Sequence, residues 1–209
     1  MVQVALADYL TALSAGQLVS FPTDTVPALA ARPEASDRIY QLKQRSAHKP
    51  LILMAAHGAD LRPYLAGGEE DWAAWTAVID QHWPGALTLV LPASDRLPPA
   101  MNLTGTASLG VRVPAHPLAQ YILARSGPLA TTSVNRSGQP PLQTMADIEA
   151  EFPQLVTLSP PAIADIYRQF DTSPPASDQP QGSGQPSTVV AWRSQGWEVL
   201  RQGSVNLKS

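Results

Sequence analysis

Apolar positions along the chain alternate between helical spacing and short continuous runs. Leu6, Leu10 and Leu13 are spaced as on one face of a helix ahead of Gly16, and the apolar run 18–21 that follows is typical of a buried strand. The same alternation predicts further helices over 36–45, 69–82, 117–123, 145–152 and 162–170, and further strands over 51–54, 87–91, 109–113, 128–133, 155–158, 188–192 and 197–200, the last two paired as a hairpin. Because helices and strands are intermixed throughout, the pattern predicts an α/β sandwich with a mixed sheet.

Two of the predicted helices begin at residues that favour a helix start. Ser36 can cap the helix that ends near Arg45 with its hydroxyl oxygen. Pro117 suits the first position of its helix, because the N–H that proline lacks is not needed there.

The segment 171–185 departs from this alternation. Its sequence, DTSPPASDQPQGSGQ, is rich in Pro, Ser, Gly and Gln and has no apolar period, which predicts a mobile loop within a single domain over 1–209. Because such a composition supports no packed core, we expect shortening of the loop to cost little thermal stability. The loop leads directly toward Ser187, so it is also a candidate lid.

Composition and charge limit the possible classes of protein and of site. The chain has 209 residues, of which 44% are apolar, which is enough for one compact core. Charged residues make up 15% and the net charge is −3, so any phosphate binding has to be local. The absence of cysteine excludes disulfides, thiolate nucleophiles and cysteine-zinc sites. The sequence has no signal-peptide pattern and no apolar run of about 18 residues, so we expect a cytoplasmic protein that does not span a membrane.

Signatures of several nucleotide-binding and metal-dependent classes are missing. The sequence contains no G-x-x-x-x-G-K-[ST] loop, no G-x-G-x-x-G after a strand and no H-E-x-x-H. The four histidines, His48, His57, His82 and His116, lie far apart without ligand spacing. We therefore expect no metal site built from protein ligands.

Polar residues stand where apolar runs end, and each has a purely structural interpretation. Lys43 and Arg45 lie in the last turn of a predicted helix, whose dipole favours cations there by about 0.3–1 kcal/mol, and this is the favoured interpretation of the pair alone. Arg112 interrupts the apolar run 109–113, and a structural ion pair and a ligand contact are equally compatible with that position. The cluster TTSVN at 131–135 is typical of a strand end followed by a capping turn.

Eight segments, taken together and in order, indicate a family resemblance that no single one of them would establish. They are FPTDTVPAL (21–29), IYQLKQR (39–45), KPLILM (49–54), WPGALTLVLP (83–92), LGVRVPAHP (109–117), PLATTSVNRSGQPP (128–141), PSTVV (186–190) and LRQG (200–203). They resemble the YrdC-like family, the threonylcarbamoyl-AMP synthases. The resemblance covers 8–203 apart from the Pro-rich loop, and its signature is the Lys-x-Arg and Ser-x-Asn pair at 43–45 and 133–135.

The resemblance implies a fold, a reaction and partners. The implied fold is a single α/β domain with a twisted mixed parallel and antiparallel sheet, helices on its faces and a deep, partly positive central cavity. The implied enzyme is a nucleotidyltransferase that makes L-threonylcarbamoyl-AMP and pyrophosphate from L-threonine, bicarbonate or CO2, and ATP. The tRNA threonylcarbamoyl-transfer machinery then passes the group to adenosine 37 of tRNAs that read codons beginning with A. Mg²⁺ is expected to bind through the ATP phosphates.

The resemblance also implies roles for ten residues, matched position by position. Those assigned to ATP are Lys43, Arg45, Ser108, Ser133, Asn135 and Arg201. Those assigned to threonine are Thr23, Arg112, Thr131 and Ser187. Lys43 and Arg45 are the catalytic pair, because in-line attack of a carbamate oxygen on the α-phosphorus leaves the protein to position substrates and neutralise charge.

Two places depart from the family pattern. The family usually reads Thr-Val-Tyr-Gly-Leu where this chain has TVPAL at 25–29, so Pro27 replaces the tyrosine and Ala28 the glycine. The two changes remove an aromatic ring, a flexible glycine and one backbone N–H. Pro141 stands in place of the small residue that usually ends Ser-Gly-x-Pro-Ser, and the replacement is expected to remove one polar contact to ATP. Both changes bear on substrate affinity.

Two other functions stay open at this point. One is an RNA-binding or ribosome-maturation module that performs no chemistry, and the other is a degenerate paralogue that only binds nucleotide. The RNA-binding alternative predicts a broad basic face, whereas a net charge of −3 with 14 Lys and Arg predicts weak RNA binding at most.

Overall fold

Ten strands form one mixed sheet in the computed structural model, which describes residues 2–194 and 196–207. In chain order the strands are β1 (Val2–Val4), β2 (Val19–Phe21), β3 (Ala28–Ala31), β4 (Ile52–Met54), β5 (Leu87–Pro92), β6 (Ser108–Arg112), β7 (Leu129–Ser133), β8 (Val156–Leu158), β9 (Thr188–Arg193) and β10 (Gly196–Arg201). The helices are α1 (Leu6–Ser14), α2 (Asp37–Lys43), α3 (Gly58–Leu61), α4 (Glu69–His82), α5 (Pro117–Ser126), α6 (Met145–Glu151) and α7 (Pro160–Arg168). Three short 3₁₀ turns lie at Pro33–Ala35, Arg62–Tyr64 and Pro99–Met101.

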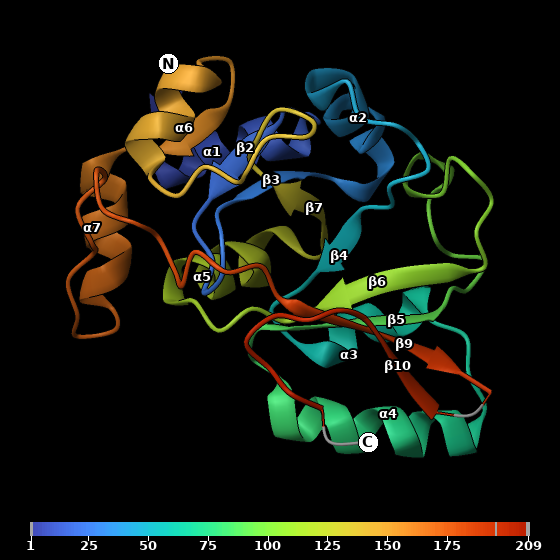
Figure 1. Ribbon diagram of the computed structural model, residues 1–209. Coiled ribbons are helices and arrows are strands. Elements are labelled where there is room, and N and C mark those ends of the chain that lie inside the picture. The colour runs from blue at the N-terminus through green and yellow to red at the C-terminus, as the bar shows by residue number, and fades with distance from the viewer. Residues whose placement is uncertain (1, 195, 208–209) are drawn as a thin grey trace.

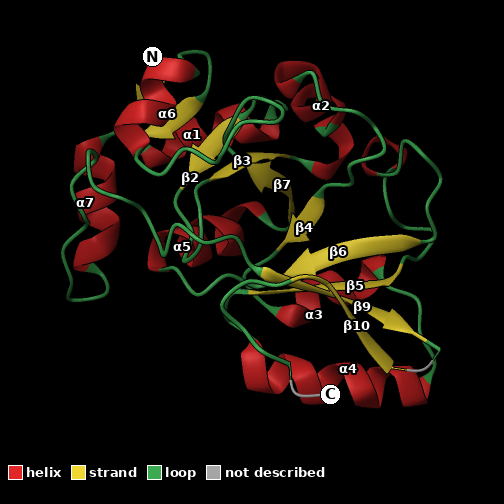
Figure 2. Cartoon of the chain, in the orientation of Figure 1, coloured by secondary structure: helices red, strands yellow, loops and turns green. Residues whose placement is uncertain are grey.

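The order of the strands across the sheet is β1-β8-β2-β3-β7-β4-β6-β5-β9-β10. Neighbours pair in parallel at β1–β8, β2–β8, β4–β6 and β5–β9, and the other pairs are antiparallel, which confirms the predicted mixed sheet. Figures 1 and 2 show the sheet twisting strongly from β2 and β3 to β9 and β10. Because β7 lies between β3 and β4, polar strand ends from distant parts of the sequence become neighbours.

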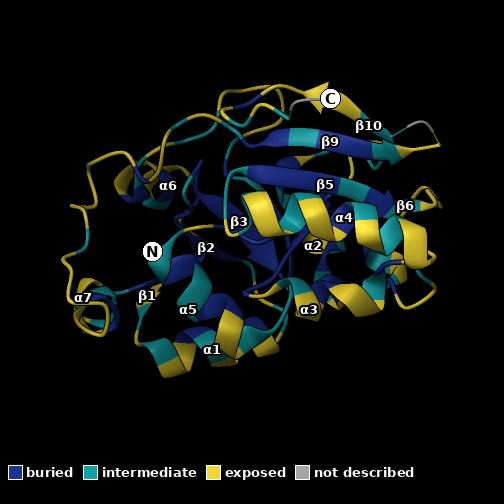
Figure 3. Cartoon of the chain, turned by 90° about the horizontal axis from the view of Figure 1, so that it is seen from below, coloured by how far each residue is buried: buried dark blue, intermediate teal, exposed yellow. Residues whose placement is uncertain are grey.

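Two apolar clusters cover the sheet. Helices α1, α5 and α7 contribute to one cluster, and α2, α3, α4 and α6 contribute to the other. Strand β3 serves both, since Leu29 and Ala31 belong to one cluster while Ala28 and Ala30 belong to the other, as the two-residue period of a strand requires. Figure 3 shows β5 and β9 largely buried, whereas α4 keeps an exposed outer face.

The structure contains every helix and strand that the apolar pattern predicts, within a few residues at the ends, and the terminal hairpin is antiparallel. The pattern misses β1, β3 and α3. Strand β3 reads Ala-Leu-Ala-Ala, a composition with weak strand preference, and it becomes a strand because β2 and β7 pair with both of its edges.

The predicted capping role of Ser36 is wrong. Ser36 occupies the position before α2, but its side chain makes no capping hydrogen bond and its backbone is already helical. The 3₁₀ turn Pro33–Ala35 runs directly into α2, so Ser36 lacks the extended conformation that a capping hydroxyl needs. Its buried Oγ has no hydrogen-bond partner among the described residues.

Candidate active site

A cavity of about 590 Å³ opens where the central strands of the sheet converge. Eight of the ten residues assigned to substrates line it: Arg45, Ser108, Arg112, Thr131, Ser133, Asn135, Ser187 and Arg201. These residues come from β6, β7, β10 and the loops beside α2, β7 and β9. The topology therefore gathers residues that are spread over most of the chain (Figure 1).

The cavity is cationic although the chain is acidic. Arg45, Arg112, Arg193 and Arg201 line it, and no carboxylate is among the described lining residues. Guanidinium groups donate several hydrogen bonds in a fixed plane and match carboxylate and phosphate oxygens. The arrangement therefore favours an anionic ligand with more than one charge.

Lys43 joins the two signature motifs behind the cavity wall. Its Nζ donates to the backbone oxygen of Ser133 and to Asn135 Oδ1, the latter at 2.8 Å. The hydroxyl of Ser133 donates to the same Oδ1 at 2.7 Å. An ammonium has three donors, and these acceptors use two of them; Lys43 itself is not among the residues that line the cavity. Burial first, and the charges of Arg45 and Lys49 second, lower the pKa of Lys43 from its usual 10.5 to about 7.

Arg45 is separated from Lys43 by a left-handed turn. Gln44 adopts φ 47° and ends α2, and the N–H of Arg45 bonds back to the oxygen of Tyr40 at 2.9 Å. The Arg45 side chain then donates to the backbone oxygens of Lys49 and Pro50 at 3.0 and 3.2 Å. These bonds fix a guanidinium on the cavity wall.

Arg112 both forms a structural ion pair and lies at the cavity, so it fits both interpretations that its position in the sequence allowed. It forms a buried ion pair with Asp24, Nη2 to Oδ1 at 2.8 Å, and donates to Thr25 Oγ1 at 2.8 Å and to the Gly85 oxygen at 2.9 Å. It also lines the cavity. Burial lowers the pKa of Arg112 and Asp24 raises it. The ion pair therefore positions a guanidinium at the cavity rather than removing it from ligand contact.

Hydroxyl groups also line the cavity. Ser187 Oγ lies 2.8 Å from the hydroxyl of Thr88, and the backbone oxygen of Ser187 accepts from Arg201 Nη2 at 2.8 Å. Thr131 Oγ1 donates to the backbone oxygen of Ile52 at 3.0 Å. The sequence analysis did not assign Thr88 to the site, although a single hydroxyl within the apolar run of β5 could have indicated it.

Thr23 is placed differently from its assigned role. Thr23 is fully buried and does not line the cavity. Its hydroxyl donates to the Val26 oxygen at 2.7 Å and lies 3.1 Å from Thr25 Oγ1. Thr23 thus shapes the turn, while Thr25 lines the cavity and accepts from Arg112.

The segment 181–187 runs over this turn, and we call it the strap. The N–H groups of Ser183 and Gly184 donate to the backbone oxygens of Asp24 and Thr25 at 3.1 and 2.8 Å. Gly182 adopts φ +87°, and an added Cβ would stand 2.3 Å from the Thr23 oxygen. The strap ends at Pro186 and Ser187, which both line the cavity. Its mobility, and that of the whole loop 171–185, remains a prediction.

Comparison with known proteins identifies the family. A family model named for Sua5, YciO and YrdC, and described as "Telomere recombination", matches residues 11–203. The chain belongs to the Sua5/YciO/YrdC family. A relative from Chromohalobacter salexigens, named threonylcarbamoyl-AMP synthase, is 38% identical over 167 residues, which cover 78% of this chain and 88% of the relative. A protein of the same name from Yersinia enterocolitica is 38% identical over 159 residues, which cover 72% of this chain and 80% of the relative.

Solved structures of Sua5/YciO/YrdC proteins share the fold. P. abyssi Sua5, solved with L-threonine, has a TM-score of 0.76 and 28% identity over 93% of this chain, which spans 52% of that protein. E. coli YciO has a TM-score of 0.76 and 20% identity, with 96% of this chain and 90% of that protein covered, and it supports the fold alone.

The departures from the Sua5/YciO/YrdC pattern lie at the cavity. Pro27, Ala28 and Pro141 all line it. Pro27 still accepts a hydrogen bond at its backbone oxygen from Val134 at 3.2 Å, so the loss of its N–H leaves the pairing of this turn in place.

Among residues 2–194 and 196–207, no group of three or more His, Cys, Asp or Glu residues could hold a metal ion. In the same part of the chain, no helix has the length and apolar character needed to cross a membrane.

Proposed function

We propose that this protein is an L-threonylcarbamoyladenylate synthase, which makes L-threonylcarbamoyl-AMP and pyrophosphate from L-threonine, bicarbonate or CO2, and ATP. The observation that carries the proposal is the cavity lined by four arginines and no described carboxylate, with Lys43 tying the Lys-x-Arg and Ser-x-Asn motifs together behind it. Membership of the family and relatives named threonylcarbamoyl-AMP synthase at 38% identity support it.

The reaction needs positioning and charge neutralisation. The amine of threonine adds to CO2 and loses a proton, which gives a carbamate. A carbamate oxygen then forms a bond to the α-phosphorus of ATP while the bond to the bridging oxygen breaks, and pyrophosphate leaves with that electron pair. Negative charge is high on both reactants, so fixed cations that need no reorganisation lower the barrier.

We assign the ATP half of the site to Lys43, Arg45, Ser108, Ser133, Asn135 and Arg201. Lys43 and Arg45 belong on the phosphates, because one is an ammonium with a free donor and the other a guanidinium fixed at the wall. Ser133 and Asn135 are oriented by Lys43 and face the same cavity. Arg201 and Ser108 complete this half.

We assign the threonine half to Arg112, Thr131 and Ser187, with Thr23 acting through the turn that presents Thr25. Arg112 suits a carboxylate or the new carbamate, because its guanidinium lines the cavity and is held by Asp24. The paired hydroxyls of Thr88 and Ser187 provide a polar wall beside it.

Mg²⁺ fits this site only as a companion of ATP. The described lining offers hydroxyls, one asparagine and one glutamine but no carboxylate, so the metal has to keep water and phosphate ligands. When bound in this way it supplies neutralisation of phosphate charge.

The product defines the partner class. Threonylcarbamoyl-AMP is an activated mixed anhydride, so a separate acceptor enzyme has to pass its threonylcarbamoyl group to adenosine 37 of tRNA. Direct RNA binding is disfavoured by the net charge of −3. We place this reaction in the cytoplasm.

Pyrophosphate release tests the proposal. Purified protein is assayed with ATP, threonine and bicarbonate, and each of the last two is omitted in turn. The proposal predicts release that requires both. Release that ignores both contradicts the proposal, and nucleotide binding without release favours the degenerate nucleotide-binding paralogue.

A further inference from the structure

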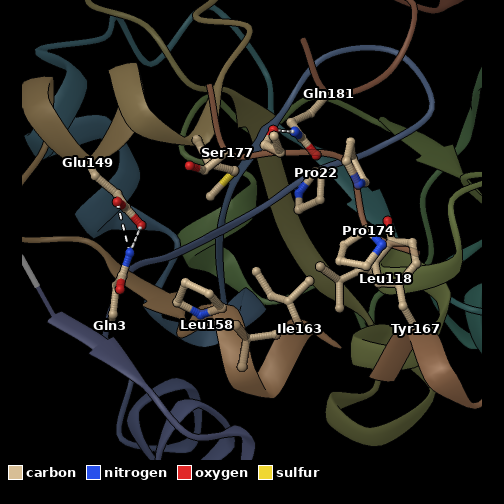
Figure 4. Close-up of a pocket in the computed structure, with 14 residues that line it drawn as sticks. Gln3, Pro22, Leu118, Glu149, Leu158, Ile163, Tyr167, Pro174, Ser177 and Gln181 are labelled. Atoms are coloured by element: carbon tan, nitrogen blue, oxygen red, sulfur yellow. Dashed lines mark hydrogen bonds between the residues drawn. The ribbon is translucent and has the colours of Figure 1, made fainter. Parts of the chain in front are cut away.

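A second cavity, of about 270 Å³, lies apart from the candidate active site and shares none of its lining residues. It is bounded by α5, α6, α7, the end of β2 and the Pro-rich segment that precedes the strap. Figure 4 shows Leu158 and Ile163 along one side and Pro22 and Gln181 on the other.

The charges around this cavity are already satisfied. Its described lining contains no lysine, arginine or histidine. Glu149 is the single carboxylate, and its oxygens accept from Gln3 Nε2 at 2.8 and 3.0 Å and from Thr157 at 3.0 Å. An anion finds no counter-charge here, and a cation has to compete with these donors. The cavity therefore suits an uncharged ligand.

Tyr167 gives the apolar wall one available polar group. Its hydroxyl lies 3.5 Å from His116 Nε2, which is at the limit of a hydrogen bond. Burial raises the pKa of Tyr167, so the hydroxyl keeps its proton and can donate. Apolar lining with a few polar groups is typical of small-molecule sites.

Two lining residues of the cavity, Gln181 and Pro22, connect it to the turn 22–25. Gln181 lines the cavity, is buried, and its N–H donates to the Gln143 oxygen at 2.8 Å. The next residues form the strap and bond to the backbone of Asp24 and Thr25. Pro22 lines the cavity from the other direction and directly precedes Thr23. A ligand here contacts Pro22 and Gln181, which adjoin the turn and the strap, and the side chains of Asp24 and Thr25 in that turn accept hydrogen bonds from Arg112.

We propose that this cavity binds a small, uncharged, mainly apolar ring molecule with one hydrogen-bonding group, and that its occupation tightens threonine binding. An apolar cavity of about 150 Å³ holds benzene, so 270 Å³ has room for a fused ring. A ligand that packs on the strap favours its ordered arrangement, and any second ligand that needs that arrangement binds more tightly. The coupling to threonine rests on the proposed function, whereas the binding itself does not.

Indole serves as the probe. Wild-type protein is titrated with indole by NMR, and threonine affinity is measured with and without saturating indole. Ile163→Trp fills the cavity, and Pro161→Trp places the same side chain on the exposed side of α7 as a matched control. We expect saturable shifts in the wild type and in Pro161→Trp, their loss in Ile163→Trp, and threonine binding tightened by roughly fivefold.

Two outcomes overturn the inference: indole shifts that do not saturate or that persist in a folded Ile163→Trp, and saturable binding with threonine affinity unchanged. If Ile163→Trp does not fold, nuclear Overhauser contacts from indole to the methyl groups of Leu118, Leu158 and Ile163 in the wild type decide the location. If indole binds but threonine does not bind with or without it, the proposed function fails and the indole site stands.

Discussion

Lys43 and Arg112 are both almost fully buried beside the same cavity, and they are held by different partners. Lys43 is fixed by oxygens of the Ser-x-Asn motif, which are neutral, whereas Arg112 is fixed by the carboxylate of Asp24. A buried cation without a counter-charge gains from an anionic ligand, and one that is already paired serves mainly to orient. The two residues should therefore respond differently to ligands and to substitution.

Substitution should separate the two halves of the site. Lys43→Ala or Arg45→Ala should weaken ATP binding by roughly 2–5 kcal/mol while threonine binding is kept, and Arg112→Ala should do the reverse. Calorimetric titration of each variant with ATP and with threonine measures this, with circular dichroism to establish folding. Equal loss of both ligands in all three folded variants contradicts the assignment, and unfolding of all three means that the residues are structural.

ATP binding should take up a proton through Lys43. Burial lowers the pKa of Lys43 to about 7, so at pH 8 the free protein holds it mostly neutral. Phosphate favours the charged form and raises that pKa, so binding consumes a proton, and ATP affinity falls as pH rises above about 7. Calorimetry at pH 8 in two buffers of different ionisation enthalpy reports the uptake. Lys43→Met should abolish it, and uptake that persists in this variant contradicts the role of Lys43.

Serine should be a poorer substrate than threonine. The two amino acids differ by one methyl group, and one methyl in a fitted pocket is worth about 1–3 kcal/mol. The ratio of kcat/KM for threonine and serine measures the difference. Equal values show that no side chain of the cavity contacts the methyl group.

At the scale of elements, the turn 22–25 has contacts on two sides. Strands β2 and β3 fix its ends, and the strap bonds to its backbone from outside. The strap belongs to no helix or strand and its sequence, QGSGQPS, is poor in apolar residues, so we expect its position to change at small cost in stability.

Gly182→Ala should displace the strap without unfolding the protein. An added Cβ would meet the Thr23 oxygen at 2.3 Å and the Thr25 oxygen at 2.8 Å. Gly127→Ala is the matched control, because Gly127 also has a positive φ, of +75°, but has nothing within 4 Å of its Cβ. We expect a raised KM for threonine in Gly182→Ala alone, with similar melting temperatures. A normal KM in that variant shows that the strap does not support the threonine site.

Elements with a strong apolar period or a continuous apolar run could be predicted from the sequence, whereas β1, β3 and α3, which have no strong pattern of either kind, could not. Helix α4 and strand β5 carry enough apolar residues in a regular pattern to be predicted from the sequence alone. Strand β3 has three alanines and owes its conformation to pairing with β2 and β7, which is non-local information. The strap is a similar case. Its composition indicates a loop, but it does not predict that the loop donates hydrogen bonds to the backbone oxygens of Asp24 and Thr25.

For the whole molecule, the sequence predicted the residues of the site better than their arrangement. The family motifs marked ten residues, and eight of them line the cavity. Asp24 was not assigned, although a buried Arg112 requires a nearby carboxylate. Thr23 was assigned to the ligand, but the fold turns it inward and presents Thr25 instead. Distances of this kind depend on how β2, β3 and β6 come together, which no local pattern encodes.

The whole molecule is acidic, yet four of its 14 Lys and Arg line one cavity that has no carboxylate among its described lining residues. This distribution suits a small polyanionic substrate better than a nucleic acid. Mass spectrometry of the product tests that account most directly. Protein is incubated with ATP, Mg²⁺, threonine and carbon-13 bicarbonate. The account predicts threonylcarbamoyl-AMP that carries the label, with pyrophosphate in equal amount. Pyrophosphate released without a labelled threonine-containing adenylate would contradict it.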